Sequence, residues 1–271
     1  METLTSLLAD FTHRLAVLIR VSAFFVAIPL FGQGVPTLAK VGLAGVITLL
    51  VAPSVAPFDL PDHAVGYTLL IAEEALIGLA MGLVVTVVIT AIYLGGQLID
   101  VPIGFSMVNV IDPQTGMQVP IVAQFKFLLA MLILFVVDGH HALLGGVAKS
   151  FQVVPIGLAT MNPGVAQVGV ETFGTMFVVA LRIALPLVAA LFLADVALGI
   201  VARAVPQINV FFVGIPLKIA FGLVMLVLVM PVFARVMAAL LSEQGEMMEA
   251  LVQLLRALTG TSAGEAALEV R

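Results

Sequence analysis

The sequence predicts an all-α membrane protein built from kinked helical hairpins, and three observations lead to this fold class. Of the 271 residues, 62% are hydrophobic and only 10% are charged, whereas a soluble domain has roughly 25% charged and about 45–50% apolar residues. The mean hydropathy is +1.24. Apolar runs of helical length recur along the chain and several contain proline, which predicts membrane helices with kinks.

Composition also excludes several classes of function. The net charge is −5 and Lys and Arg form no cluster, so a nucleic-acid partner is not expected. Cysteine is absent, which removes thiolate chemistry and disulfides. The chain has no GxxxxGK[ST], HExxH or GxSxG motif, so we expect no enzyme activity, no catalytic residues and no cofactor. Trp is absent and Tyr occurs only at Tyr67 and Tyr93, so the usual aromatic belts are nearly missing.

The first two helices are expected near His13–Leu30 and over Pro36–Ala52. Arg14 and Arg20 flank and interrupt the first run, which argues for an uncleaved helix rather than a signal peptide. Pro36 is a favoured first-turn residue for the second helix.

The third helix is expected over Ala75–Ile99, the longest uncharged run. Glu73 and Glu74 stand at its predicted start, where the helix dipole favours carboxylates; a buried ion pair or a role on an ion path is the alternative. Gly78 and Gly82 have GxxxG spacing, which permits close approach of another helix.

The stretch from Gly95 to Pro120 cannot be helical throughout, because prolines recur in it with glycines between them. Apolar and small residues alternate from Val101 to Met107, which predicts extended chain. Asn109 and the Asp112–Pro113 pair then favour turns. Such backbone at membrane depth must be buried by protein or line a wet cavity. A surface loop between two spans is the alternative.

A fourth helix is expected over Ile121–Val137, ended by Asp138-Gly139-His140-His141. An Asp and two His suggest a metal site, but neighbouring residues on a helix point about 100° apart and no further cluster completes the ligand set. Capping is therefore favoured and no metal is expected. Residues 142–171 are expected to form a partly packed connection.

The fifth and sixth helices are expected over Thr172–Val205 and Asn209–Leu241, joined by the Pro206–Asn209 turn into an antiparallel hairpin. Charges within membrane spans should face protein or water and pair with one another. The sequence does not decide between partners for Asp195. The charged residues that we expect to be buried are Glu73, Glu74, Arg182, Asp195, Arg203 and Lys218.

Residues 242–258 differ from the rest of the chain. Acidic residues open the segment and apolar residues recur at helical spacing from Met247 to Leu258, which predicts an amphipathic helix with Ser242 as N-cap. This helix is suited to lying against a partner or another subunit. The last segment, 259–271, is expected to be a flexible tail.

Three strings then resemble one family. GQLIDVPIGFSMVNVIDPQTGMQVPIVAQF, LFVVDGHHALL and ARAVPQINVFFVGIPLKIAFG closely resemble the FliR family, the R subunits of the export gate in bacterial flagellar type III secretion. The resemblance covers roughly Arg14 to Phe233. It implies a division into a P-subunit-like region at 1–171 with a plug loop at 100–120, a Q-subunit-like hairpin at 172–241, the amphipathic helix at 242–258 and the tail.

The resemblance also implies function and partners. It suggests one structural subunit of a gate, combined with P-type and Q-type subunits and contacting B-type and A-type export proteins, that passes unfolded flagellar proteins. The location implied is the inner membrane at the flagellar basal body, with the assembly protruding toward the periplasm and lipid around it. The residues that would seal the channel are Phe105, Ser106, Met107, Val108, Asn109, Val110, Ile111, Asp112, Pro113, Gln114, Thr115, Gly116 and Met117. Unbranched Met suits a compressible seal.

A secondary transporter for a small solute or ion is the alternative function. It would use broken helices and intramembrane charges such as Glu73, Glu74, Arg182 and Asp195. This alternative predicts an inverted internal repeat, and the sequence contains no convincing one.

Overall fold

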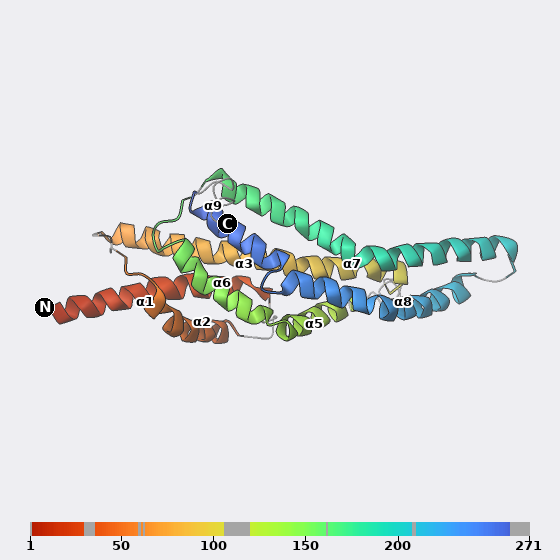
Figure 1. The fold of residues 1–271 in the computed structure, drawn as a ribbon. Helices are drawn as coiled ribbons and strands as arrows, with labels where there is room; N and C mark the ends of the chain where they lie inside the picture. The colour runs from red at the N-terminus through yellow and green to blue at the C-terminus, as the bar shows by residue number, and fades with distance from the viewer. Residues whose placement is uncertain are drawn as a thin grey trace. The chain divides into compact units, whose positions relative to one another are not determined.

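The regular structure in the described part of the chain is entirely helical, which confirms the predicted fold class (Figure 1). The computed structural model describes residues 2–29, 36–58, 61, 63–105, 120–160, 162–207 and 210–260. The elements are α1 (Glu2–Ala27), α2 (Thr37–Val51), the 3₁₀ turn η2 (Ala52–Ser54), α3 (Ala64–Ile103), α5 (Ile121–Val136), α6 (Gly139–Val153), α7 (Pro163–Ala204), α8 (Val210–Leu241) and α9 (Glu246–Leu258).

Several of these helices have the length and apolarity of membrane spans. Within the described residues there are 4 such segments, namely 37–54, 64–103, 163–204 and 212–258, or up to 5 if the bent pair α5 and α6 is one span. A span needs about 20 predominantly apolar residues, and this requirement is met. The sequence prediction of a membrane protein is therefore supported by the helices themselves.

The chain divides into two compact units, and the long helices α3 and α7 contribute to both. The first unit comprises residues 1–88, 138–173 and 242–271. The second comprises residues 89–137 and 174–241.

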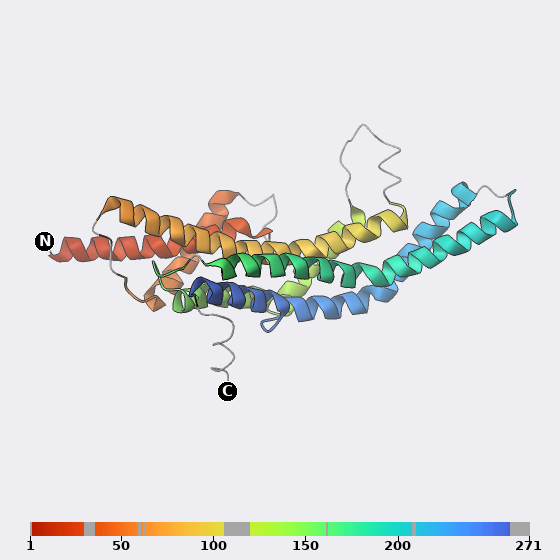
Figure 2. The same ribbon diagram turned by 90° about the horizontal axis from the view of Figure 1, so that it is seen from above.

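In the first unit, α1 and α3 run side by side and parallel (Figures 1 and 2). A Cβ added at Gly78 would lie less than 3.0 Å from the Arg20 carbonyl oxygen, and one at Gly82 would lie equally close to Ala27. One turn further on, the Thr86 hydroxyl donates to the Ala27 carbonyl oxygen at 2.7 Å. The predicted close approach at these two glycines is confirmed, and α1 is the helix that approaches.

The first unit also contains α6, in a region where the sequence predicted a connection. The connection was predicted over 142–171, and that prediction is wrong for residues 142–153, because the polar and glycine-rich composition concealed a helical period. The buried face of α6 follows spacings of three and four residues, as an amphipathic helix should; its buried residues are Gly139, Ala142, Leu143, Gly146, Val147, Ser150 and Phe151.

Helix α9 confirms the predicted amphipathic helix. Met247, Leu251, Leu254, Leu255 and Leu258 are all buried, and the helix packs on α6 of the same chain. We expected a partner protein to cover this face, so that expectation is wrong. The predicted N-cap is also wrong, because Gly245 occupies the N-cap position and Ser242 lies before it.

In the second unit, α7 and α8 form the predicted antiparallel hairpin. The contact between Leu191 and Gly222 is followed by the contact between Asp195 and Lys218, so numbers rise on one helix as they fall on the other. Both helices contain proline in their interior, as expected from the sequence: Pro186 lies in α7, and Pro216 and Pro231 lie in α8. The core of this unit is formed by Ile99, Ile103, Val122, Ala184, Leu187 and Leu191.

Helix α3 extends beyond both predicted ends. It begins at Ala64, so Glu73 and Glu74 lie well inside the helix and the prediction that they cap it is wrong. At the other end it includes Val101–Ile103, which the alternating pattern had assigned to extended chain. Pro102 lies in the last turn, where it removes one N–H from the helix ladder, and Gly104 with φ of +101° ends the helix.

Two other helices begin earlier than expected. Helix α1 starts at Glu2 and α7 starts at Pro163. The Asn162 side-chain oxygen accepts a hydrogen bond from the Gly164 N–H at 2.8 Å, a favourable start for α7. The first residues of α7 had been assigned to the connection at 142–171.

Candidate functional site

Of the residues predicted to seal a channel, Phe105 lies in the described part of the chain, and Ser106–Met117 lie outside it. Phe105 follows Gly104 and packs, partly buried, against the core of the second unit. The predicted seal therefore starts from a packed aromatic residue at the end of α3.

The described residues on either side of 106–119 are joined by a carboxylate. Asp100, in the last turn of α3, is 6% exposed. Its Oδ1 accepts from the Val122 N–H at 2.8 Å, and its Oδ2 accepts from the Ala123 N–H at 3.1 Å. These two N–H groups belong to the first turn of α5, where a helix leaves its donors without intrahelical partners. Asp100 was not among the residues predicted from the sequence. The available signal was an acidic residue directly before the Val101–Pro102 step in a mostly apolar stretch.

A second buried group lies in the first unit. Arg20 and Glu74 are both fully buried, with Nε to Oε2 at 2.6 Å and Nη2 to Oε1 at 3.0 Å. This two-bond geometry is the strong form of an arginine–carboxylate pair. A buried ion pair was one of the alternatives predicted for Glu74, and the structure shows that Arg20 is its partner.

Arg20 also holds the end of α6. Its Nη1 donates to the Val154 carbonyl oxygen at 2.9 Å and to the Ser150 carbonyl oxygen at 3.1 Å. Val154 is the C-cap residue of α6, and its own N–H already donates to the Ser150 carbonyl oxygen at 2.8 Å. The guanidinium thus adds donors at the C-terminus of the helix, where the helix dipole favours a cation. The Phe151 ring lies 4.2 Å from the guanidinium carbon and covers it.

The two glutamates of α3 bind the segment that follows α6. Glu74 Oε1 accepts from the Gly157 N–H at 3.3 Å, and Glu73 Oε1 accepts from the Ala159 N–H at 2.8 Å. Gly157 has φ of +74°, a conformation that favours glycine. The two carboxylates therefore hold α3 against Arg20 of α1 and against the turn at residues 157–159 that follows α6.

The remaining predicted charges are placed differently. Asp195 pairs with Lys218, whose Nζ lies 2.7 Å from Oδ2, and this contact settles a choice that the sequence left open. Within the single chain Glu73 and Lys218 are half-buried, while Arg182, Asp195 and Arg203 are exposed.

Asp138, His140 and His141 lie together at the start of α6. One ligand-capable atom from each lies within 4.8 Å of the others. The two imidazole ring centroids are 4.1 Å apart, so the expectation that these neighbours point apart is wrong. Asp138 is the N-cap residue in a left-handed conformation, and its Oδ1 lies 3.3 Å from His141 Nδ1. This exposed contact joins two residues three positions apart at the start of α6.

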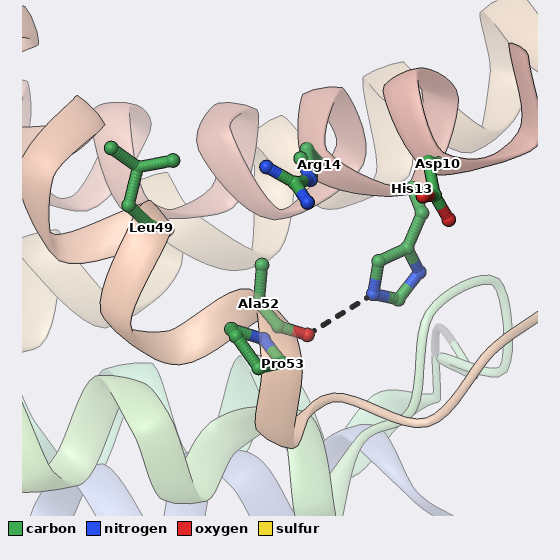
Figure 3. Close-up of a pocket in the computed structure, with 6 residues that line it drawn as sticks. All are labelled: Asp10, His13, Arg14, Leu49, Ala52 and Pro53. Atoms are coloured by element: carbon green, nitrogen blue, oxygen red, sulfur yellow. Dashed lines mark hydrogen bonds between the residues drawn. The ribbon is translucent and has the colours of Figure 1, made fainter. Parts of the chain in front are cut away.

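A pocket in the first unit, of about 190 Å³, is lined by residues of α1, α2 and η2 (Figure 3). His13 Nε2 lies 3.3 Å from the Ala52 carbonyl oxygen, and its ring stacks on Phe58 at 5.9 Å. The imidazole is thus held by backbone and an aromatic ring. The lining supplies no hydroxyl or thiol nucleophile; it consists of Asp10, His13, Arg14, Leu49, Ala52 and Pro53.

These observations define an all-helical membrane protein in which the buried polar groups of the described residues tie helices together. The family model for bacterial export proteins, family 1, matches residues 11–244. The chain therefore belongs to this family. Its C-terminal helix α9 lies beyond the matched region.

Curated relatives specify the branch. The chain is 41% identical over 259 residues to the flagellar biosynthetic protein FliR of Bacillus subtilis, covering 93% of this chain and 99% of the relative. It is 30% identical over 227 residues to the protein of the same name from Escherichia coli, covering 83% and 87%. The Aquifex aeolicus protein of that name is 27% identical, covering 81% and 85%. The chain is a member of the FliR family, as the sequence motifs predicted.

Proposed function

We propose that this chain is a structural, non-catalytic subunit of the flagellar type III export gate, forming a channel for unfolded flagellar proteins with P-type and Q-type subunits. As a FliR family member with membrane-grade helices, it is a membrane component of the flagellar export apparatus. The finer proposal includes contacts with B-type and A-type proteins and a position in the inner membrane with the assembly protruding toward the periplasm.

The observation that carries this proposal is the surface of the α7–α8 hairpin. Large apolar side chains on it remain exposed in the single chain; examples are Phe177 at 57%, Phe192 at 64%, Phe212 at 75% and Leu228 at 64%. Lipid could cover such residues, but the same hairpin carries the Asp195–Lys218 pair, with Asp195 46% exposed. A charged pair is costly against hydrocarbon. A wall shared with other subunits and water accommodates both kinds of surface.

The sealing role is proposed for residues 105–117. The support is chemical and local: this stretch contains two methionines and one acidic residue, and the helix that follows it is held by Asp100. Adaptable, mostly uncharged side chains can close around a channel axis and yield to a passing chain.

Deletion of Phe105–Val119 tests the seal. We expect P-, Q- and R-type subunits still to co-purify, and we expect cells that carry the variant to become permeable to small ions and solutes. Deletion of residues 261–271 is the control and should leave permeability at the parental level. Unchanged permeability in the loop deletion would count against the seal.

The requirement for partners is tested by purification. Co-expression with P-type and Q-type subunits should be necessary for a stable, monodisperse preparation in detergent. Solute-coupled transport by the chain reconstituted alone would instead support the secondary-transporter alternative.

A further inference from the structure

The start of α5 depends on a carboxylate from another helix. Its N-cap residue is Pro120, which forms no side-chain capping hydrogen bond. Asp100 supplies the missing acceptors from 22 and 23 residues earlier in the chain, to Val122 and Ala123. A side-chain acceptor at a helix start contributes about 0.5–2 kcal/mol when it comes from the N-cap itself. Here the capping acceptor comes from α3, so the interaction joins the end of α3 to the start of α5.

A close backbone contact lies next to this carboxylate. A Cβ added at Gly96 would lie less than 3.0 Å from the Cα and N atoms of Ala123. Gly96 is four residues before Asp100, so both lie on the same face of α3. The absence of a side chain at Gly96 lets α5 come close enough for the Asp100 carboxylate to reach its N–H groups.

Lys126 extends the interaction to α7 and α8. It is 2% exposed, and its Nζ donates to the Ile183 carbonyl oxygen at 3.5 Å. Ile183 lies in α7, three residues before Pro186. The ammonium also lies 5.0 Å from the ring centroid of Phe233. Asp100 is the acidic group that interacts electrostatically with this buried ammonium.

We propose that Asp100 and Lys126 form a clasp that fixes the position of α5, Asp100 relative to α3 and Lys126 relative to α7. Because the sealing stretch is attached to α3 and α5, the clasp sets where its two ends lie. This inference rests on the proposed function for the seal itself, but the position of the helix ends can be measured independently. Asp100 is thus a positioning residue, acting through the backbone of α5.

Replacement of Asp100 by Asn separates this role from simple side-chain volume. An amide retains one acceptor oxygen but presents an NH₂ group in place of the second, opposite a backbone donor. It also removes the acidic charge that acts on the buried Lys126 ammonium, and an uncompensated buried charge is costly. The double variant Asp100→Asn/Lys126→Met removes that second penalty and keeps the capping defect.

The chain contains no cysteine, so spin labels can be placed without removing native thiols. Val101 and Ile121 are 67% and 51% exposed and flank the clasp. We would label cysteines at these two positions and measure their distance distribution by pulsed EPR in the co-purified complex. The parent chain should give a single narrow peak. Asp100→Asn and the double variant should lose it and give a broad or two-peaked distribution, with Asp195→Asn as a matched control that keeps the narrow peak.

A broad distribution in the parent chain would overturn the clasp without any Asp100 variant, and so would a narrow one in both Asp100 variants. Ion permeability separates the two proposals. If deletion of Phe105–Val119 causes leak and both Asp100 variants keep the narrow distance distribution, the clasp fails and the seal stands. If the deletion causes no leak while Asp100→Asn broadens the distribution, the clasp stands and the seal fails.

Discussion

Two ion pairs among the described residues, Arg20–Glu74 and Asp195–Lys218, share their chemistry and differ in their surroundings. Arg20 and Glu74 have no exposed side-chain surface, and the guanidinium also donates to the end of α6. Lys218 and Asp195 remain 19% and 46% exposed between two apolar helices. The first pair exchanges hydration for a set of protein partners, whereas the second keeps part of its hydration. The Arg20–Glu74 pair therefore organises the chain itself, whereas the Asp195–Lys218 pair depends on what lies beside the hairpin.

The largest expected effect comes from breaking the buried pair. Glu74→Gln leaves the Arg20 guanidinium buried without a counter-charge, which costs about 3–5 kcal/mol in comparable sites. We expect the purified complex to lose that much stability in denaturant-induced unfolding in detergent, and the chain to accumulate poorly in membranes. A loss below about 1 kcal/mol would show that the pair is hydrated in the complex.

Removal of both charges should be less harmful than removal of one. In Arg20→Met/Glu74→Leu no charge is left buried, but the Val154 carbonyl loses the guanidinium donor and the Ser150 carbonyl keeps only the Val154 N–H. We expect about 1–3 kcal/mol of destabilisation from those lost hydrogen bonds. A double-mutant cycle with the two single variants measures the coupling. Additive losses would contradict a direct interaction.

The close packing that brings Arg20 beside Glu74 should be sensitive to one methyl group. Gly78→Ala places a Cβ less than 3.0 Å from the Arg20 carbonyl oxygen, so α1 must move away from α3. Overpacking of this kind costs about 1–3 kcal/mol. Gly174→Ala is the matched control, since a Cβ there meets nothing within 4 Å, and a helical Gly→Ala change should stabilise by up to about 1 kcal/mol. Equal melting temperatures for the two variants would argue against the tight α1–α3 contact.

The sequence predicted helix ends well where proline marks them and poorly where a helix continues into polar or glycine-containing residues. Helices α2, α5 and α8 lie within one or two residues of their predicted bounds, because proline and a change of polarity mark their ends. Helix α6 was missed because its stabilisation comes from burial against α9 and from Arg20 at its C-terminus. Neither contact is encoded in local composition.

For the functional residues, local motifs could be read from the sequence and long-range contacts could not. Motifs led to the FliR family because VIDPQTG and DGHH are local strings. Asp100 and Lys126 were not identified, since their roles arise from contacts across 22 and 57 residues. The partner of Glu74 is 54 residues away. Pairings at such separations depend on which helix faces meet, and a single sequence does not specify that.

The smallest expected effect lies at the exposed pair. Asp195→Asn and Lys218→Met should each change stability by less than about 1 kcal/mol, and their coupling should be about 0.2–1 kcal/mol, because partly hydrated pairs gain little from proximity. The measurement is a double-mutant cycle on the co-purified complex, with salt varied, since added salt should weaken a water-facing pair further. A coupling as large as that of Arg20 and Glu74, and insensitive to salt, would mean that neighbouring subunits remove the water from this pair. In that case the hairpin would be a dry interface at this point, and the two ion pairs would differ in the single chain but not in the assembly.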